Sequence, residues 1–194
     1  MPLTGAFIGF LMWVLAAALK SADLEEVAFL SYFLIEGINH VDGLSDFFDS
    51  VFARNKVRAL KDTKVGVGGV VSLASFTLVL YSAMPHANPL DLMLAQSLAK
   101  SSMLLLLLRN DAAWEGMAKV FRENVRTRDY IGLLFSLILV AALGDLRSIQ
   151  ALIVFLLVVF SIEFYSRKHF SGISGDVLGA ANCLTFAAVI LCLQ

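Results

Sequence analysis

The stretch of sequence that decides the fold is Glu36-Gly-Ile-Asn-His40-Val-Asp42-Gly-Leu-Ser-Asp46-Phe-Phe-Asp49. On a helix, Asp42, Asp46 and Asp49 stand at positions i, i+4 and i+7, so their carboxylates project from one face. Asn39 falls on the same stripe. Three like charges in one stripe repel each other, and this indicates a divalent cation with hard oxygen ligands, Mg²⁺ where phosphates are also bound. The alternative is an acidic helix face exposed to water.

Apolar runs surround this acidic stripe on both sides. The chain has 194 residues, of which 59% are hydrophobic and 16% are charged, whereas a typical soluble domain carries about 25% charged residues. This composition is typical of a membrane protein, and it makes a water-exposed acidic face the weaker interpretation. Both cysteines, Cys183 and Cys192, fall in the last apolar run, where packing is their expected role.

The apolar runs are long enough to cross a membrane, since a helix that spans the hydrocarbon core takes roughly 20 apolar residues. We predict an all-α, polytopic transmembrane bundle of about seven spans, with six as the fallback, in a single integral membrane domain over residues 1–194. The predicted spans are 3–19, 27–41, 65–84, 90–108, 130–143, 149–162 and 177–193. The second runs directly into the acidic stripe, and the fifth and sixth are short enough for a tilted or re-entrant hairpin.

The loop charges predict the orientation in the membrane, because cations favour the cytoplasmic side of short loops. Twelve lysines and arginines fall in the loops after the second, fourth and sixth spans, and two fall in the loops on the other side. This bias places the N-terminus inside and the active site at the cytoplasmic face of the cell (inner) membrane. In the basic loop 109–129, Trp114, Met117, Phe121 and Val125 recur at helical spacing, which predicts an amphipathic helix on the membrane surface.

The basic segment after the acidic stripe surrounds a fourth carboxylate. Asp62 lies between Lys61 and Lys64 and is either a further metal ligand or an ion-pair partner. The lysines either hold phosphate as point charges or only set the topology. Gly66 and Gly69 open the third span, where backbone amides at a helix N-terminus bind phosphate or small residues allow close helix packing.

Three further polar residues stand out. His40 and Glu36 are predicted neighbours at i and i+4 on one helix. His40 is a candidate general base or metal ligand, or else a hydrogen-bonded structural residue. Lys100 interrupts the fourth span at a cost of about 3 kcal/mol on insertion scales, so it either pairs with an acid or binds an anion. Asp176 begins the last span, as a helix cap or as a ligand.

Motifs along nearly the whole chain carry a family resemblance. They are His40-x-Asp42-Gly-Leu-x-Asp46-x-x-Asp49, Lys61-Asp62-x-x-x-Gly66-x-x-Gly69, Glu115-Gly-Met117 with Phe121, and Ser174-Gly-Asp176-x-x-Gly-Ala. In this order they resemble the cobalamin synthase family (adenosylcobinamide-GDP ribazoletransferase). Ser50, Asn182 and the Lys100-Ser101 pair depart from the family pattern, and the leading segment of longer members is lacking.

The resemblance implies an Mg²⁺-dependent membrane transferase that joins GDP-activated adenosylcobinamide to α-ribazole or its 5′-phosphate and releases GMP. The catalytic residues that it implies are His40, Asp42, Asp46 and Asp49, and the metal ligands are Asp42, Asp46, Asp49 and Asp62. The substrate-binding residues that we expect are Asn39, Lys61, Lys64, Gly66, Gly69, Lys100, Glu115 and Asp176. Membrane lipid is an expected partner and nucleic acid is not, whereas a homo-oligomer and a complex with corrinoid-pathway enzymes stay open.

Other functions remain as alternatives. One is a membrane enzyme similar to the CDP-alcohol phosphotransferases, whose acids are spaced differently. Another is a cation or proton transporter that uses the intramembrane acids and Lys100, and a third is a non-catalytic anchor for a corrinoid-enzyme complex. Because the acids gather with cations at one membrane face, the sequence favours phosphate chemistry over a conduction path.

Overall fold

The computed structural model describes residues 1–62 and 64–194 and confirms the all-α prediction. Apart from one isolated bridge between Ala112 and Ile173, the regular structure of these residues is helical. The α-helices are α1 (Pro2–Ser21), α2 (Leu30–Glu36), α3 (Ile38–Phe52), α4 (Lys56–Leu60), α5 (Val67–Ala83), α6 (Pro89–Arg109), α7 (Met117–Asn124), α8 (Ile131–Leu143), α9 (Leu146–Phe170) and α10 (Gly175–Cys192). Short 3-10 turns are η1 (Glu25–Val27), η2 (Met84–His86) and η3 (Thr127–Tyr130).

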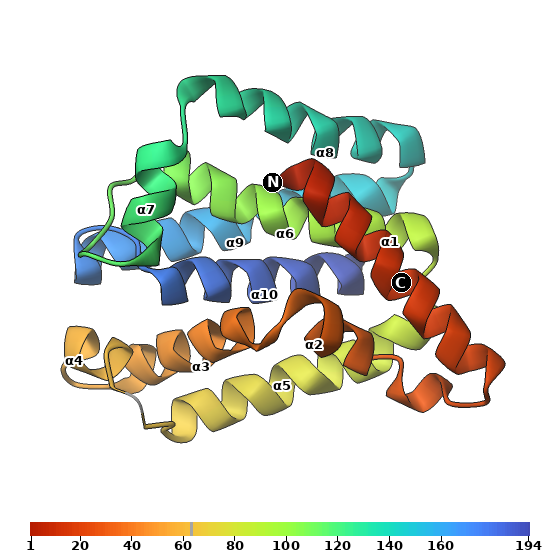
Figure 1. Cartoon of the computed structure of the whole chain (residues 1–194), viewed down its shortest axis with the longest axis horizontal. Coiled ribbons are helices and arrows are strands. Elements are labelled where there is room, and N and C mark those ends of the chain that lie inside the picture. The colour runs from red at the N-terminus through yellow and green to blue at the C-terminus, as the bar shows by residue number, and fades with distance from the viewer. Residues whose placement is uncertain (63) are drawn as a thin grey trace.

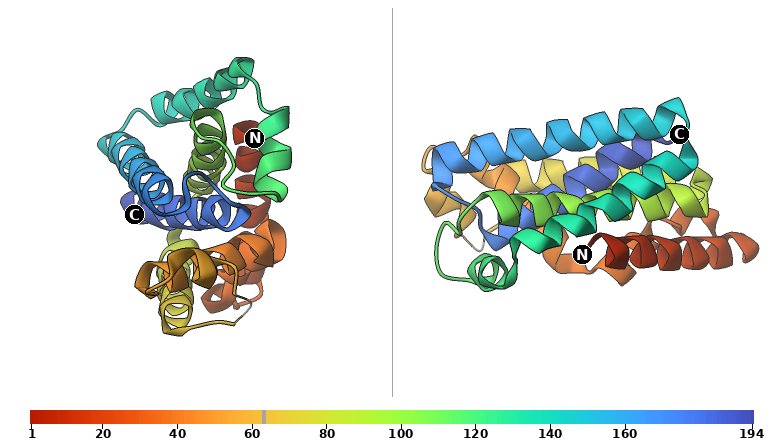
Figure 2. Two further views of the ribbon diagram at one scale, coloured as in Figure 1. Left: turned by 90° about the vertical axis from the view of Figure 1, so that its left-hand side faces the viewer. Right: turned by 90° about the horizontal axis from the view of Figure 1, so that it is seen from above.

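Helix α10 lies at the centre of the bundle (Figure 1). Helices α3 and α5 lie on one side of it, and α6, α8 and α9 lie on the other, as Figure 1 and the left view in Figure 2 show. Most side chains of α10 are therefore buried, among them Leu178, Phe186 and Ile190. The central position of α10 lets it contribute residues both to the core and to the site described below.

Helix α1 crosses α6 at close range, and two glycines make this possible. A Cβ atom added at Gly5 would lie 2.5 Å from the carbonyl oxygen of Gln96, and one added at Gly9 would lie 2.2 Å from that of Leu92. Any larger residue would force the helices apart. Small residues one turn apart commonly allow such close packing of membrane helices.

Five stretches of helix are long and apolar enough to cross a membrane: α1, α5 with η2, α6, α9 and α10. Many of their outward side chains are large and apolar, such as Phe7, Leu78 and Phe164, which suits contact with lipid. These features confirm a polytopic helical membrane protein. Helices α2 and α8 have 7 and 13 residues, so the count of seven spans stays a prediction.

The prediction that residues 27–41 form one span running into the acidic stripe is wrong in one respect. Helix α2 ends at Glu36, and the stripe lies on a separate helix, α3. The chain breaks at Gly37, where φ is 89° and ψ is 161°. This backbone conformation is readily available only to glycine, so a single residue turns the acidic helix away from the one before it.

Three basic segments meet at one end of the bundle, on the left in Figure 1. This basic end comprises the α3–α5 connection with α4, helix α7, and the turn from α9 to α10. The predicted amphipathic helix over 109–129 is shorter than expected, because α7 begins only after Gly116. Trp114 lies in the preceding loop. The Ala113 amide donates to the Ile173 carbonyl and the Ile173 amide donates to the Asp111 carbonyl, which holds this loop against the start of α10. Which side of the membrane the basic end faces stays a prediction.

Candidate active site

The candidate site is built where α3 crosses α10. A Cβ atom added at Gly43 would lie 2.9 Å from the Cα of Asp176, and one added at Gly179 would lie 3.0 Å from the carbonyl oxygen of His40. The two backbones are therefore in contact, and the close approach brings the acidic stripe of α3 to the first turn of α10. Ser174 caps that turn by accepting a hydrogen bond from the Val177 amide, 3.3 Å away.

Carboxylates converge on Asp46 at this crossing. Burial, and after it the negative charges of four neighbouring aspartates, together raise the pKa of Asp46 to about 6. The four are Asp42, Asp176, Asp49 and Asp62. The structure therefore gathers the three carboxylates of the stripe with the two others that the sequence indicated, from different elements.

The donor chemistry of this group suits a magnesium ion. Among residues 1–62 and 64–194, no three His, Cys, Asp or Glu side chains lie close enough together to hold a metal by themselves. Mg²⁺, however, is usually held by one or two carboxylates, several waters and the phosphate oxygens of a substrate. Burial raises the pKa of Asp46 most, and the repulsion from its neighbours adds to it. A bound cation would relieve that repulsion, so the residues present fit the ion.

Asp49 occupies the N-terminus of α5. Its two carboxylate oxygens accept hydrogen bonds from the amides of Gly66 and Gly69, each at 2.7 Å. Both glycines are needed at these positions, because an added Cβ would lie 2.6 Å from Asp49 Oδ1 at the first and 2.3 Å from Ser45 Oγ at the second. The sequence predicted phosphate binding at this helix N-terminus as one of two roles for Gly66 and Gly69. In the structure the two amides bind the Asp49 carboxylate of the chain itself.

A cleft of about 370 Å³ opens beside the acidic group, and we call it the α3–α10 cleft. Its polar lining consists of Asn39, His40, Asp42 and Asp176, and its apolar lining includes Met103, Met117, Phe121 and Leu178. Larger hollows of about 500 and 560 Å³ lie elsewhere on the molecule, but residues of the acidic stripe do not line them. The α3–α10 cleft is therefore where chemistry-bearing side chains meet space for a ligand.

The cations that the sequence assigned to the substrate lie in different surroundings. The Lys61 ammonium lies 4.2 Å from the centroid of the Trp114 ring, which joins the end of α4 to the loop before α7. The backbone amide of Lys64 donates to Asp62 Oδ1 at 3.2 Å. Glu115 is paired with Lys119, and its side chain is 85% exposed, outside the lining of the cleft. Of this set, Lys61 and Lys64 adjoin Asp62 along the chain, and Lys64 contacts it through its backbone amide.

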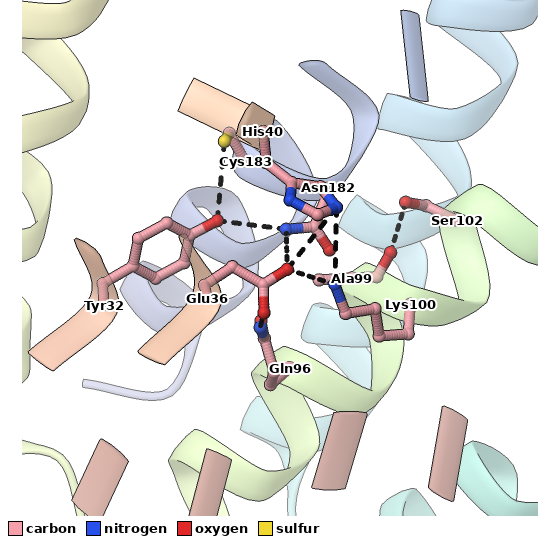
Figure 3. A network of polar contacts seen from close by, with 9 residues as sticks. All are labelled: Tyr32, Glu36, His40, Gln96, Ala99, Lys100, Ser102, Asn182 and Cys183. Atoms are coloured by element: carbon pink, nitrogen blue, oxygen red, sulfur yellow. Dashed lines mark hydrogen bonds and ion pairs between the residues drawn. The ribbon is translucent and has the colours of Figure 1, made fainter. Parts of the chain in front are cut away.

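Lys100 has the first of its two expected roles, because it pairs with an acid. Its ammonium contacts the Glu36 carboxylate in the interior of the bundle (Figure 3). The amide groups of Gln96 and Asn182 also donate to Glu36. His40 Nε2 lies 3.5 Å from the Lys100 ammonium and 3.6 Å from Glu36 Oε1, across the break at Gly37. The interpretation of Glu36 and His40 as neighbours along one continuous helix is therefore wrong, although they do meet.

Three members of this network went unnoticed in the sequence: Tyr32, Gln96 and the donor role of Asn182. The Asn182 amide donates to the Tyr32 hydroxyl at 3.1 Å, and that hydroxyl lies 3.4 Å from Cys183 Sγ. A polar residue inside an apolar span is a recognisable signal. Its partners come from other helices, however, and spacing along the chain does not reveal them.

The fold and the site together define a polytopic membrane protein with an acidic cleft at one end of its helical bundle. Residues 1–194 match the family model described as cobalamin-5-phosphate synthase. The chain therefore belongs to the cobalamin-5-phosphate synthase family. This membership selects the cobalamin synthase interpretation over a CDP-alcohol phosphotransferase or a transporter.

Curated relatives named adenosylcobinamide-GDP ribazoletransferase agree with the family match. One from Archaeoglobus fulgidus is 43% identical over 169 residues, which is 86% of this chain and 73% of the relative. One from Pyrococcus furiosus is 31% identical over 199 residues, covering 99% and 85%. One from Methanocella arvoryzae is 30% identical over 205 residues, covering 92% and 76%. No solved structure matches the chain.

Proposed function

We propose that this protein is an adenosylcobinamide-GDP ribazoletransferase of the cytoplasmic membrane. It joins GDP-activated adenosylcobinamide to α-ribazole or its 5′-phosphate and releases GMP in a late step of cobalamin biosynthesis. The observation that carries the proposal is the convergence of Asp42, Asp46, Asp49, Asp62 and Asp176 beside a ligand-sized cleft. The family match and the relatives of that name support it.

The bond changes follow from the substrates. A hydroxyl oxygen of α-ribazole forms a bond to the phosphorus that stays with the corrinoid. The bond from that phosphorus to the bridging oxygen of the diphosphate breaks, and GMP leaves with the bridging oxygen. The hydroxyl proton passes to a base of the chain: His40, which lines the cleft, or one of the aspartates near it.

In this proposal Mg²⁺ would be held by carboxylates from the set Asp42, Asp46, Asp49 and Asp62, with water and substrate phosphate oxygens as its other ligands. A bound Mg²⁺ supplies charge neutralisation for phosphate oxygens and for the leaving group. The chain's own contribution is positional. The amides of Gly66 and Gly69 fix the Asp49 carboxylate, and the contact of α3 with α10 holds Asp42 close to Asp176. Lys61 and Lys64 add positive charge at the same end for the diphosphate.

Turnover by the purified protein tests the proposal. The protein in detergent or nanodiscs is incubated with GDP-activated adenosylcobinamide and Mg²⁺, and parallel arms receive α-ribazole, its 5′-phosphate or no acceptor. GMP release and corrinoid product are followed by chromatography. We expect both to depend on an acceptor, and the rates in the two acceptor arms identify the preferred one. Corrinoid that stays unchanged in every arm would overturn the proposal.

A further inference from the structure

The α3–α10 cleft has two linings of opposite chemistry. The polar side carries Asn39 and His40 with the carboxylates of Asp42 and Asp176. The apolar side is made by three helices, and its members are Met103 of α6, Met117 and Phe121 of α7, and Leu178 of α10. A ligand that fills this space must itself be amphipathic, with one hydrophobic part and one part rich in oxygen.

The volume of the cleft restricts the ligand further. Small-molecule sites usually measure about 300–1,000 Å³, and the cleft, at about 370 Å³, lies at the small end of that range. A nucleoside fits this space. A corrin ring with its nucleotide arm is far larger and cannot enter it. Of the two substrates in the proposed reaction, only the acceptor fits the cleft as a whole molecule. The guanosine end of the other substrate is of similar size, but its polar base does not suit the apolar side of the cleft.

The depth of the apolar side chains defines a floor and a mouth. Met103 and Leu178 are 7% and 2% exposed and form the floor, whereas Met117 and Phe121 are 64% and 37% exposed and stand at the mouth. Met117 and Phe121 are four residues apart on α7, so they share one face of that helix. Helix α7 is tied to the bundle by Arg122, whose Nε donates to the Asn110 carbonyl at 2.9 Å. The two mouth residues are therefore held over the cleft.

We propose that the α3–α10 cleft is the site for α-ribazole, with α7 as its specificity-determining wall. The flat benzimidazole base lies against Met103, Met117 and Phe121, where sulfur–aromatic and aromatic contacts favour it. The ribose then points toward Asp42 and Asp176, which places its hydroxyl beside the acidic group. This inference rests on the proposed function and adds to it the place where the acceptor binds.

The competing explanation is that the apolar face of α7 lies against the membrane surface. Val120 distinguishes the two explanations, because it is an apolar residue of the same helix, is 54% exposed, and is not part of the cleft lining. If lipid contact is the purpose of this face, Val120 contributes to it as Met117 and Phe121 do. If α-ribazole is the occupant, Val120 contributes nothing.

The test compares Phe121→Ala and Met117→Ala with the control Val120→Ala. For each variant, KM and kcat are measured for both substrates, and binding of α-ribazole alone is measured by calorimetry. We expect Phe121→Ala to raise the KM and Kd for α-ribazole by at least about tenfold, since even one methylene in an apolar pocket is worth about tenfold or more. The KM for GDP-activated adenosylcobinamide should stay the same, and Val120→Ala should match the unaltered protein.

Each other outcome has a definite meaning. Equal increases in both KM values, or the same loss with Val120→Ala, would overturn the inference and favour a membrane contact. Unchanged affinity for α-ribazole in both cleft variants would overturn it directly. If the unaltered protein binds α-ribazole in a Phe121-dependent way but releases no GMP, the site stands and the proposed function fails. Thermal unfolding of each variant shows that the change is local, and Phe121→Leu, which keeps apolar bulk, should restore part of the affinity.

Discussion

The Lys100 ammonium, in the middle of α6, forms an ion pair with the Glu36 carboxylate at the end of α2, although 64 residues separate them in the chain (Figure 3). The Glu36 side chain is 1% exposed, and amide groups from α6 and α10 complete its hydrogen bonds. Three helices thus share one buried charge pair. His40 lies against the pair, so the network joins the interior of the bundle to the polar side of the cleft.

The stability of the bundle should depend on this pair. Lys100→Met or Glu36→Gln alone leaves one uncompensated group in the interior, and breaking a buried pair typically costs about 3–5 kcal/mol. The double variant removes both charges and should lose less than either single variant. Thermal unfolding in detergent measures the difference. The exposed pair Lys20–Glu25 is the control, because a surface pair is worth at most about 1 kcal/mol. A double variant less stable than both single variants would contradict this explanation.

Turnover should require the carboxylates of the acidic stripe. Asp42→Asn, Asp46→Asn and Asp49→Asn each remove a charged oxygen ligand without adding bulk, so we expect activity to be lost while membrane insertion is retained. A chelator should have the same effect, and added Mg²⁺ should reverse it. The control is Asp23→Asn, because Asp23 lies in an exposed turn with φ of 56°, which asparagine also tolerates. Full turnover in chelator would remove the metal from the proposal.

Glycine should be required where α5 holds Asp49. Gly66→Ala or Gly69→Ala would place a methyl group within 2.6 Å of Asp49 oxygens, which forces that carboxylate off both amides. We expect a large fall in kcat with a moderate loss of stability, measured by steady-state assay and thermal unfolding. At Gly132 an added Cβ makes only an ordinary contact at 3.4 Å, so Gly132→Ala should leave both quantities nearly unchanged. Normal activity in Gly69→Ala would show that Asp49 need not be fixed.

Much of the architecture was predictable from the sequence, because apolar runs and the positions of prolines and cations report local properties. The limits of α1, α5, α6 and α10 agree with the predicted spans within a few residues. The break at Gly37 was missed, since one glycine inside an apolar run does not by itself mark a break. Helix α9 continues past its predicted end at residue 162, and the charged residue that follows, Glu163, is buried and paired with Arg109.

The candidate site was predictable only in part. Helical spacing placed Asp42, Asp46 and Asp49 on one face. The structure adds that this face contacts the first turn of α10 and the N-terminus of α5. The capture of Asp49 by the α5 N-terminus depends on how two helices are placed in space. Likewise, periodicity identified the apolar face of α7, but it does not distinguish a face turned to lipid from one turned to a cleft. Long-range partners of this kind follow from packing rather than from local sequence.

The orientation of the bundle in the membrane should follow the cations of its basic end. In a Cys192→Ser background, a cysteine placed at Lys119 should react with a membrane-impermeant reagent only from the cytoplasmic side. One placed at His86, in the turn before α6, should react only from outside. Cys183 is fully buried and should not interfere. Labelling of position 86 from the cytoplasm would reverse the predicted orientation or change the span count.

The lysines beside Asp62 should bind the diphosphate rather than only set the topology. Replacing both Lys61 and Lys64 by Gln removes two charges near the acidic group, where a hydrogen bond to a charged group is worth about 1.5–3 kcal/mol. Binding of GDP-activated adenosylcobinamide should weaken at least about tenfold, since each 1.4 kcal/mol is a decade. Affinity for α-ribazole, which has no diphosphate, should hardly change.

Lys168→Gln, at the same end of the bundle on α9, controls for a general loss of positive charge. Equal weakening in this control, or an unchanged affinity in the double variant, would return Lys61 and Lys64 to a purely topological role.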